Sequence, residues 1–249
     1  MACAHSSLSL AKLNYAAYVG VSTQRKILTS WNLKALREKL QATHDKADVD
    51  RAVTYMDSFD WKSKAALYHV NTADEVFSKY SGRKDEDVIE MMHRLFSEEF
   101  DVEFETARRI REFSLVAAAT TVHTLPEVLA QVITVSINPE IKNVHSISFN
   151  DVVKRIMNPE YKSKLEDLQG SFEYQYIHAF TNTIKHISLV KPKYNVGFDE
   201  QNYHGVVFDS FTFKGKDFES IRDEQLIELI NSIRMHCVEL GQDLNELVC

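Results

Sequence analysis

The chain has 249 residues, of which 44% are hydrophobic and 26% are charged, a composition typical of a globular protein. Only 7 Gly and 4 Pro leave few places for turns, which disfavours a β-rich fold and makes helix the expected structure. The net charge of −7 and the pI near 5.8 argue against general nucleic-acid binding, although a local basic patch is compatible with an acidic average.

The cysteines indicate the compartment. Cys3, Cys237 and Cys249 stand far apart and form no CxxC pair, which is typical of reduced thiols in a cytosolic protein. Residues 1–21 lack a basic region, and polar side chains interrupt their apolar residues, so a signal peptide is disfavoured. We therefore expect a cytoplasmic protein.

The first hundred residues are more polar than the rest and predict a helical periphery. Apolar residues recur at helical spacing over 8–21. Ser30 or Asn32 can cap a second helix that reaches about His44. Three further helices are expected at Ala47–Met56, Trp61–Tyr80 and Asp85–Phe96.

The longest weakly charged run covers residues 107–137 and predicts the central helix of the fold. It carries no charge between Phe113 and Val122, and its small residues lie all round a helical wheel, as in a buried helix. Because Pro126 has no backbone N–H, the helix should bend about one turn before it, and Pro139 should end it.

This run is not expected to span a membrane. Arg108, Arg109 and Arg111 precede its uncharged part. His123 and Glu127 fall within the ~20 residues that a span would need. We therefore expect no membrane partner, and the other helices should pack around the run.

Beyond the central helix the sequence predicts short helices, a hairpin over 187–213 and a long final helix. After His186 the apolar period changes to 2, and the residues DEQN at 199–202 suit a hairpin turn. From Leu226 to Leu247 apolar residues alternate spacings of four and three, a coiled-coil-like seam. The other expected elements are helices Phe149–Met157, Glu160–Leu168 and Phe172–His186 and strands Ile187–Phe198 and Val206–Phe213.

These elements predict one mainly α domain over 1–249, a helical bundle around a buried central helix with a C-terminal β-hairpin. Residues 103–249 should form the core and residues 1–100 the periphery. The seam and the aromatic hairpin offer more apolar surface than one domain easily hides, so we expect at least a homodimer. The alternative is that the seam packs inside the domain, on the central helix.

Polar residues that can carry chemistry follow one stripe of the predicted 172–186 helix. His178, Asn182 and His186 lie at i, i+4 and i+8. They form either a structural polar seam or a site. Lys185 lies beside them, and this group is the set of candidate catalytic residues.

His123 and Glu127 lie at i, i+4 on the central helix. We expect both to be buried and within reach of the 172–186 helix, because buried polar groups need partners. Lys185, His178 or His186 can supply the partner of Glu127.

A second set of residues is predicted to bind an anion. Lys185, Lys191 and Lys193 bring positive charge beside Asn182 and His186, and such a focus attracts a phosphate or a carboxylate. Binding there should weaken with salt, because exposed charges are screened over ~8 Å at physiological ionic strength. His123, Glu127 and His178 are the other candidate binding residues.

Metal and cofactor chemistry are disfavoured. A metal site built from His123, Glu127, His178 and His186 is chemically allowed, but the sequence lacks HExxH. The motifs GxxxxGK, GxGxxG and GxSxG are also missing from the sequence. We therefore expect no metal ion and no cofactor.

The hairpin is rich in aromatic residues. These side chains either stack on bases, as in single-strand binders, or pack on the helices, and packing is the favoured alternative. The residues are Phe198, Tyr203, Phe208, Phe211 and Phe213.

The stretches VHTLPEVLAQVI, FTNTIKHISLVKPKYNV, GVVFDSFTFKG and ELGQDLNELV resemble a group of poorly characterised bacterial helical proteins, and the long-helix arrangement is similar to the HEPN superfamily. The resemblance covers roughly residues 103–249. It implies a HEPN-like bundle and a place in a bacterial defence or stress system. HEPN ribonucleases carry an Arg a few residues before a His. The resembling region has Asn182 and His186 without that Arg, and the match Arg37 to His44 lies outside it.

Two functional classes follow. The first is a non-catalytic helical module that binds a protein partner or itself. The second is a metal-independent HEPN-like ribonuclease that uses His186, Asn182 and Lys185, with RNA as its partner. The missing Arg and the acidic charge favour the first class, and no DNA-binding motif is found in the sequence.

Overall fold

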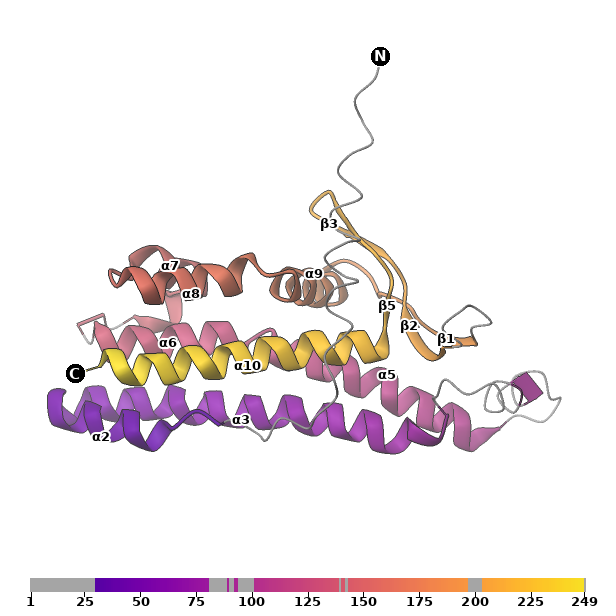
Figure 1. Ribbon diagram of the computed structural model, residues 1–249, viewed down its shortest axis with the longest axis horizontal. Coiled ribbons are helices and arrows are strands. Elements are labelled where there is room, and N and C mark those ends of the chain that lie inside the picture. Colours follow the sequence, from indigo (N-terminus) through magenta and orange to yellow (C-terminus); the bar gives the residue numbers. More distant parts are fainter. Residues whose placement is uncertain are drawn as a thin grey trace, which may run out of the picture. The chain divides into compact units, whose positions relative to one another are not determined.

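The computed structural model describes residues 30–80, 89, 92–93, 101–138, 140–141, 143–196 and 203–248. The predicted helix 8–21, most of the predicted helix 85–96 and the turn 199–202 lie outside these residues. From Trp31 onward the chain forms one compact unit. This unit is mainly helical with a small antiparallel sheet near its C-terminal end, as predicted (Figure 1).

The elements follow the expected order with several changes of boundary. The helices are α2 (Leu33–Thr43), α3 (Lys46–Phe77), α5 (Val102–Val122), α6 (Leu125–Ile137), α7 (Phe149–Arg155), α8 (Pro159–Gly170), α9 (Phe172–His186) and α10 (Asp223–Leu247), with 3-10 turns η1 (Ser78–Tyr80) and η2 (Val144–Ser146). The strands are β1 (Pro192–Val196), β2 (His204–Phe208), β3 (Phe211–Phe213), β4 (Lys216–Phe218) and β5 (Ile221–Arg222).

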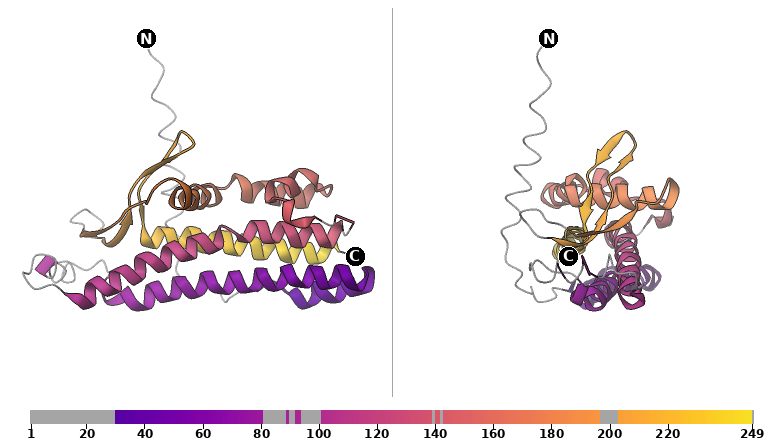
Figure 2. Two further views of the ribbon diagram at one scale, coloured as in Figure 1. Left: turned by 180° about the vertical axis from the view of Figure 1, so that it is seen from behind. Right: turned by 90° about the vertical axis from the view of Figure 1, so that its right-hand side faces the viewer.

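One long helix, α3, stands where the sequence suggested two. It begins at the cap Asp45, whose side chain accepts from the N–H of Asp48 at 2.9 Å. It lies along α5 and α6, so this polar part of the chain also contributes to the core (Figures 1 and 2). Most of its other residues are at least partly exposed, which explains the polar composition of the region. The buried residues of α3 are Asp48, Val49, Ala52, Tyr55, Met56, Phe59, Ser63, Ala66, Val70, Ala73 and Phe77.

The predicted helix over 107–137 is two helices, α5 and α6, which meet at a break. There the N–H and the hydroxyl of Thr124 both donate to the backbone oxygen of Thr121, at 3.1 and 2.8 Å. Pro126 is the second residue of α6 and has no N–H with which to continue α5. The predicted bend about one turn before Pro126 is therefore confirmed.

Burial differs between these two helices. α6 is buried almost all round, as its composition predicts, and it contacts α3, α7 and α10. α5 is buried on the side that contacts α3, α9 and α10, but Phe113 on its other side is 65% exposed. The expectation that no side of the whole run faces solvent is therefore wrong for α5.

The range Val102–Ile137 is long and apolar enough to cross a membrane by length and composition alone. Half of its most apolar window is buried within the protein, as in the core helix of a soluble protein. Within this range the charged residues Arg111 and Glu112 of α5 are buried. The fold is therefore compatible with a soluble protein.

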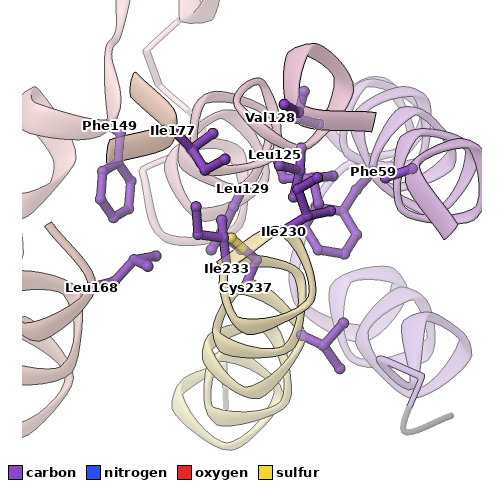
Figure 3. Packing of buried hydrophobic residues seen from close by; sticks show 14 of the residues in the cluster. Phe59, Leu125, Val128, Leu129, Phe149, Leu168, Ile177, Ile230, Ile233 and Cys237 are labelled. Carbon is purple, nitrogen blue, oxygen red and sulfur yellow. The ribbon is translucent and has the colours of Figure 1, made fainter. Parts of the chain in front are cut away.

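The seam of α10 packs inside the unit. Ile230, Ile233 and Cys237 lie against Leu125 and Leu129 of α6 (Figure 3). α10 also contacts α2, α3, α5, α8 and α9, so it is as central as α6. The alternative in which the seam packs internally is confirmed, and these residues are unavailable to a second copy. Burial also raises the pKa of the Cys237 thiol well above its usual range, which makes it unreactive.

The strands form more than the single hairpin that the sequence predicts: a three-stranded sheet and a separate two-stranded one. β1 and β2 pair antiparallel, with Lys193 opposite Val207, and β5 adds to the other side of β2. The predicted strand 206–213 is split, because the N–H of Asp209 donates to the oxygen of Lys191 at 2.9 Å and the chain then turns into a second hairpin, β3–β4. Pro192, not Ile187, begins the first strand.

A close contact between Trp31 and α10 gives a stability prediction. A Cβ at Gly241 would overlap the indole ring of Trp31, whose N–H donates to Asn245 at 2.9 Å. We expect Gly241→Ala to destabilise the protein by about 1–2 kcal/mol, because overpacking outweighs the gain in helix propensity. The control is Gly170→Ala, where a Cβ meets nothing within 4 Å.

Urea unfolding at neutral pH measures the free energy of unfolding of both variants and of wild type. Gly170→Ala should be neutral or stabilising by up to ~1 kcal/mol. Equal stability of the two variants would contradict the close packing of Trp31 on α10.

Candidate functional site

Two histidines meet at the break between α5 and α6. His123 caps the C-terminus of α5, and its Nε2 lies 3.2 Å from Nδ1 of His178 in the middle of α9. Asn182, one turn further along α9, donates to the oxygen of His178 at 2.7 Å and lies 3.5 Å from Nε2 of His123. The predicted contact between His123 and the 172–186 helix is confirmed.

Both imidazoles are held in the neutral form. Burial lowers the pKa of His123 to about 4, and the nearby His178 and Lys185 add to this effect. Burial and Lys214 also lower the pKa of His178. At neutral pH one ring can therefore donate to the other, each with one N–H and one free nitrogen lone pair.

Positive side chains flank the pair on two sides. Lys62 of α3 donates to the hydroxyl of Thr124 at 2.9 Å, beside His123. Burial, followed by the charge of Lys185, lowers the pKa of Lys62, so the two lysines are close to each other. On the other side the charge of Lys214 lowers the pKa of His178. The side chains thus form a row of basic groups from α3 across α9 to the β3–β4 turn.

Glu127 is partly buried but does not contact the predicted partners. Its carboxylate accepts from the backbone N–H of Phe149 at 2.9 Å, at the start of α7. Burial raises its pKa, against the effect of this hydrogen bond. The prediction that Lys185, His178 or His186 pairs with Glu127 is wrong, because a free N–H at a helix start meets the same need.

The predicted catalytic residues do not come together as a group. The side chain of Asn182 contacts His123 and the backbone of His178. Lys185 and His186 are exposed at the end of α9. In the described part of the chain the side chain of His186 has no hydrogen-bond partner. Lys193 forms an ion pair with Asp209 at 2.8 Å, and Lys191 is exposed. The lysines past α9 therefore give less free charge than the sequence predicts.

The four candidate metal ligands are also separated. Glu127 bonds to α7, and His186 lies exposed at the end of α9, away from the contact of His123 with His178. Among the residues that the structure describes, no three His, Cys, Asp or Glu side chains are grouped so that they could hold a metal ion.

An open pocket of about 450 Å³ lies between α9 and the β3–β4 hairpin, next to the histidine pair. No described residue that lines it is acidic. Lys216 is held in place by its hydrogen bond to Gln175 at 2.9 Å. The side chains that matter here are Tyr174, His178, Phe213, Lys214, Lys216 and Phe218.

The turn that carries Lys214 has an unusual backbone. Lys214 has φ 51° and Gly215 has φ 76°, so both residues are left-handed. Such a two-residue turn favours Asn-Gly, since a side chain with a long stem is uncommon at positive φ. The sequence pattern did not indicate this turn or the pocket, because the hairpin was expected to end at Phe213.

Most aromatic residues of the hairpin region pack internally, as favoured by the sequence. Phe208 lies edge-on to Phe180, and Phe211 stacks on Phe218 with centroids 5.1 Å apart. Tyr203 is buried, and Phe198 lies outside the described residues. Phe213 differs, because it faces His178 at the pocket.

Comparison of the sequence with protein-family models and curated proteins, and of the fold with solved structures, finds no match. The function therefore has to be argued from the site.

Proposed function

We propose that this protein is a non-catalytic, HEPN-like helical interaction module, and that single-stranded RNA is its partner at the pocket between α9 and β3–β4. The pocket carries the proposal. It combines the rings of Tyr174 and Phe213 with Lys214 and Lys216. Aromatic faces that stack on bases, beside lysines that contact phosphates, are the usual means of binding single strands.

The basic groups beyond the pocket support an extended ligand. From His178 they continue through His123 to Lys185 and Lys62. A base in the pocket would leave the adjoining phosphates along this row, where the neutral imidazole of His178 can donate a hydrogen bond and lysines supply charge. The net charge of −7 then confines attraction to this part of the surface.

The strained turn supports a role for Lys214 in binding. A non-glycine residue at positive φ costs on the order of 1 kcal/mol, and such strain tends to persist at ligand sites. Lys214 at φ 51° lines the pocket, and its Nζ lies 5.2 Å from the centroid of the Phe213 ring. A cation there can move from the ring to a phosphate when ligand binds.

A non-catalytic role is favoured over ribonuclease activity. Cleavage without metal needs a base and a protonated acid near the same phosphate. His123, with a pKa of about 4, is unprotonated at neutral pH and cannot be that acid. His178 is left as a base without the acid, and His186 is exposed at the end of α9.

The cellular context is part of the proposal. The buried, reduced Cys237 and the acidic composition suit the cytoplasm. The HEPN resemblance suggests a bacterial defence or stress system, in which a module of this kind would hold RNA without cutting it.

Fluorescence anisotropy with a short labelled RNA tests the proposal. We expect binding that weakens as salt rises, and a loss of about ten-fold in affinity for the double variant Lys214→Gln, Lys216→Gln. Phe213→Ala should cost about 1–3 kcal/mol if the ring stacks on a base. The matched control is Lys34→Gln, Lys46→Gln, which changes the net charge equally at exposed positions on α2 and α3.

Three results would count against this function. Equal RNA affinity of the pocket variant and its control would show that the RNA is not bound at this pocket. Binding of an acidic protein in place of RNA would make the partner a protein. RNA that is cut without metal by wild type, but not by His178→Ala, would favour the ribonuclease.

A further inference from the structure

One nitrogen of the His178 ring is left for a ligand. Its Nδ1 lies 3.2 Å from Nε2 of His123, so this side of the ring is used within the protein. Nε2 lies on the other side of the imidazole, has no hydrogen-bond partner among the described residues and is not closed off from solvent. Because His178 lines the pocket between α9 and β3–β4, Nε2 is the nitrogen that a bound base can reach.

The surroundings of His123 decide whether that nitrogen donates or accepts. Nδ1 of His123 is buried and has no hydrogen-bond partner in the described part of the chain. In proteins, buried N–H groups without an acceptor are rarer than buried acceptors without a donor, so the proton of the neutral His123 ring belongs on Nε2. This N–H then donates to Nδ1 of His178, and the proton of the neutral His178 ring lies on its Nε2.

Asn182 is compatible with this assignment. Its amide nitrogen donates to the backbone oxygen of His178 at 2.7 Å. The distance from the same nitrogen to Nε2 of His123 is 3.5 Å, the outer limit of a hydrogen bond. The opposite assignment would depend on this long contact, and it would leave the Nδ1–H of His123 buried and unpaired.

The other polar side chains of the pocket also donate. Lys214 and Lys216 line it and carry only N–H donors. Burial raises the pKa of Tyr174 to about 12, so its hydroxyl keeps its proton at neutral pH. The side-chain oxygen of Gln175 already accepts from Lys216 at 2.9 Å. The described side chains of the pocket therefore offer a ligand several donors and no carboxylate.

We propose that the pocket selects RNA bases that carry a carbonyl, uracil and guanine, over the amino bases cytosine and adenine, and that Nε2–H of His178 is the selecting donor. This inference rests on the proposed RNA binding. Uracil has an oxygen where cytosine has an amino group, and guanine has an oxygen where adenine has one. The N–H of His178 can bond to that oxygen, whereas an amino group in the same place brings two donors together.

Fluorescence anisotropy with two pairs of short labelled RNAs tests the selection. Oligomers of uridine and cytidine differ by a carbonyl in place of an amino group, together with the proton on the adjacent ring nitrogen. Oligomers of inosine and adenosine differ in the same way. We expect wild type to bind the carbonyl member of each pair about ten-fold more tightly. His178→Phe keeps a ring and loses the N–H, so it should bind both members of each pair with equal affinity.

His123 is a positioning residue in this proposal, because it fixes the proton of His178 without contacting the base. His123→Leu leaves Nδ1 of His178 without its donor, so the proton can occupy either nitrogen. We expect the preference for uridine over cytidine to fall in this variant. The matched control is His236→Leu, at an exposed position of α10, which should keep the wild-type preference. Circular dichroism checks the fold of each variant.

Nitrogen-15 NMR of the imidazole rings in the free protein observes the proton directly. At neutral pH we expect Nε2 of His178 to be protonated and Nδ1 to be bare. A proton on Nδ1 of His178, equal affinities of wild type for the two members of each RNA pair, or a preference that survives His178→Phe would overturn the proposal. Wild type that binds none of the four oligomers would instead refute the proposed function, and this inference with it.

Discussion

Replacement of Arg111 by methionine is expected to remove about 3–5 kcal/mol of stability, because it leaves a buried carboxylate without its cation. Arg111 is 4% exposed and Asp223 is 1% exposed. The Nε of Arg111 donates to Asp223, and another guanidinium nitrogen donates to the oxygen of Ala73 at 3.0 Å and to Asp74 at 2.9 Å.

Asp223 joins this arginine to the sheet. Its carboxylate accepts from the hydroxyl of Tyr203, from the N–H of Val206 at 3.2 Å and from the N–H of Glu224 at 2.7 Å. Burial and the Asp223 charge raise the pKa of the Tyr203 hydroxyl, which therefore remains a donor. The network connects α3, α5, β2 and α10, so its loss should affect the whole unit.

The control for this prediction is Arg109→Met, two residues away on the exposed side of α5. Surface substitutions of this kind usually change stability by less than ~0.5 kcal/mol. Urea unfolding at neutral pH compares the two variants. A loss at Arg111→Met no larger than that at Arg109→Met would show that the ion pair contributes little.

Acidification from pH 7 to pH 4 is expected to remove about 3 kcal/mol of stability through His123 alone. The folded-state pKa of about 4 lies below the value of ~6.5 for an unfolded chain. The unfolded state therefore binds the proton first. The contribution of His123 is fully present above about pH 6.5 and is lost as pH falls through the folded-state pKa.

Urea unfolding at several pH values, for wild type and His123→Gln, isolates this effect. Glutamine does not titrate, and its amide can still bond to His178. The variant should lose about 3 kcal/mol less than wild type between pH 7 and pH 4. The control is His186→Gln, whose side chain is exposed, and it should follow wild type. Parallel losses in wild type and His123→Gln would contradict a partly buried, neutral imidazole at position 123.

Helix boundaries followed from the sequence where local signals set them. α9 spans Phe172–His186 as predicted, because Ser171 caps it through the N–H of Tyr174 and the apolar period changes after it. The break before Pro126 likewise needs only a missing N–H. The strand 206–213 was not predictable in this way. Its two halves have the same period, and only the bond from Asp209 to Lys191 separates them.

The site was predictable in part. Two histidines in apolar helices had to find polar partners, and His123 meets His178. The partner of Glu127 was not predictable, because any helix start offers free N–H groups and the sequence does not show that α7 lies nearby. The exposure of Lys185 and His186 was also not predictable. The spacing of residues along a helix does not show which part of the helix other elements cover.

The sequence by itself determined the mainly helical class, the buried stripe of each helix and the need of the polar exceptions for partners, since these depend on local composition and period. Tertiary structure alone decided which groups meet. Arg111 and Asp223 are 112 residues apart, and their pairing depends on how α5 and α10 pack. The pocket likewise exists only because the β3–β4 turn brings Lys214 against α9. Such contacts arise from the packing of whole elements, which no local pattern records.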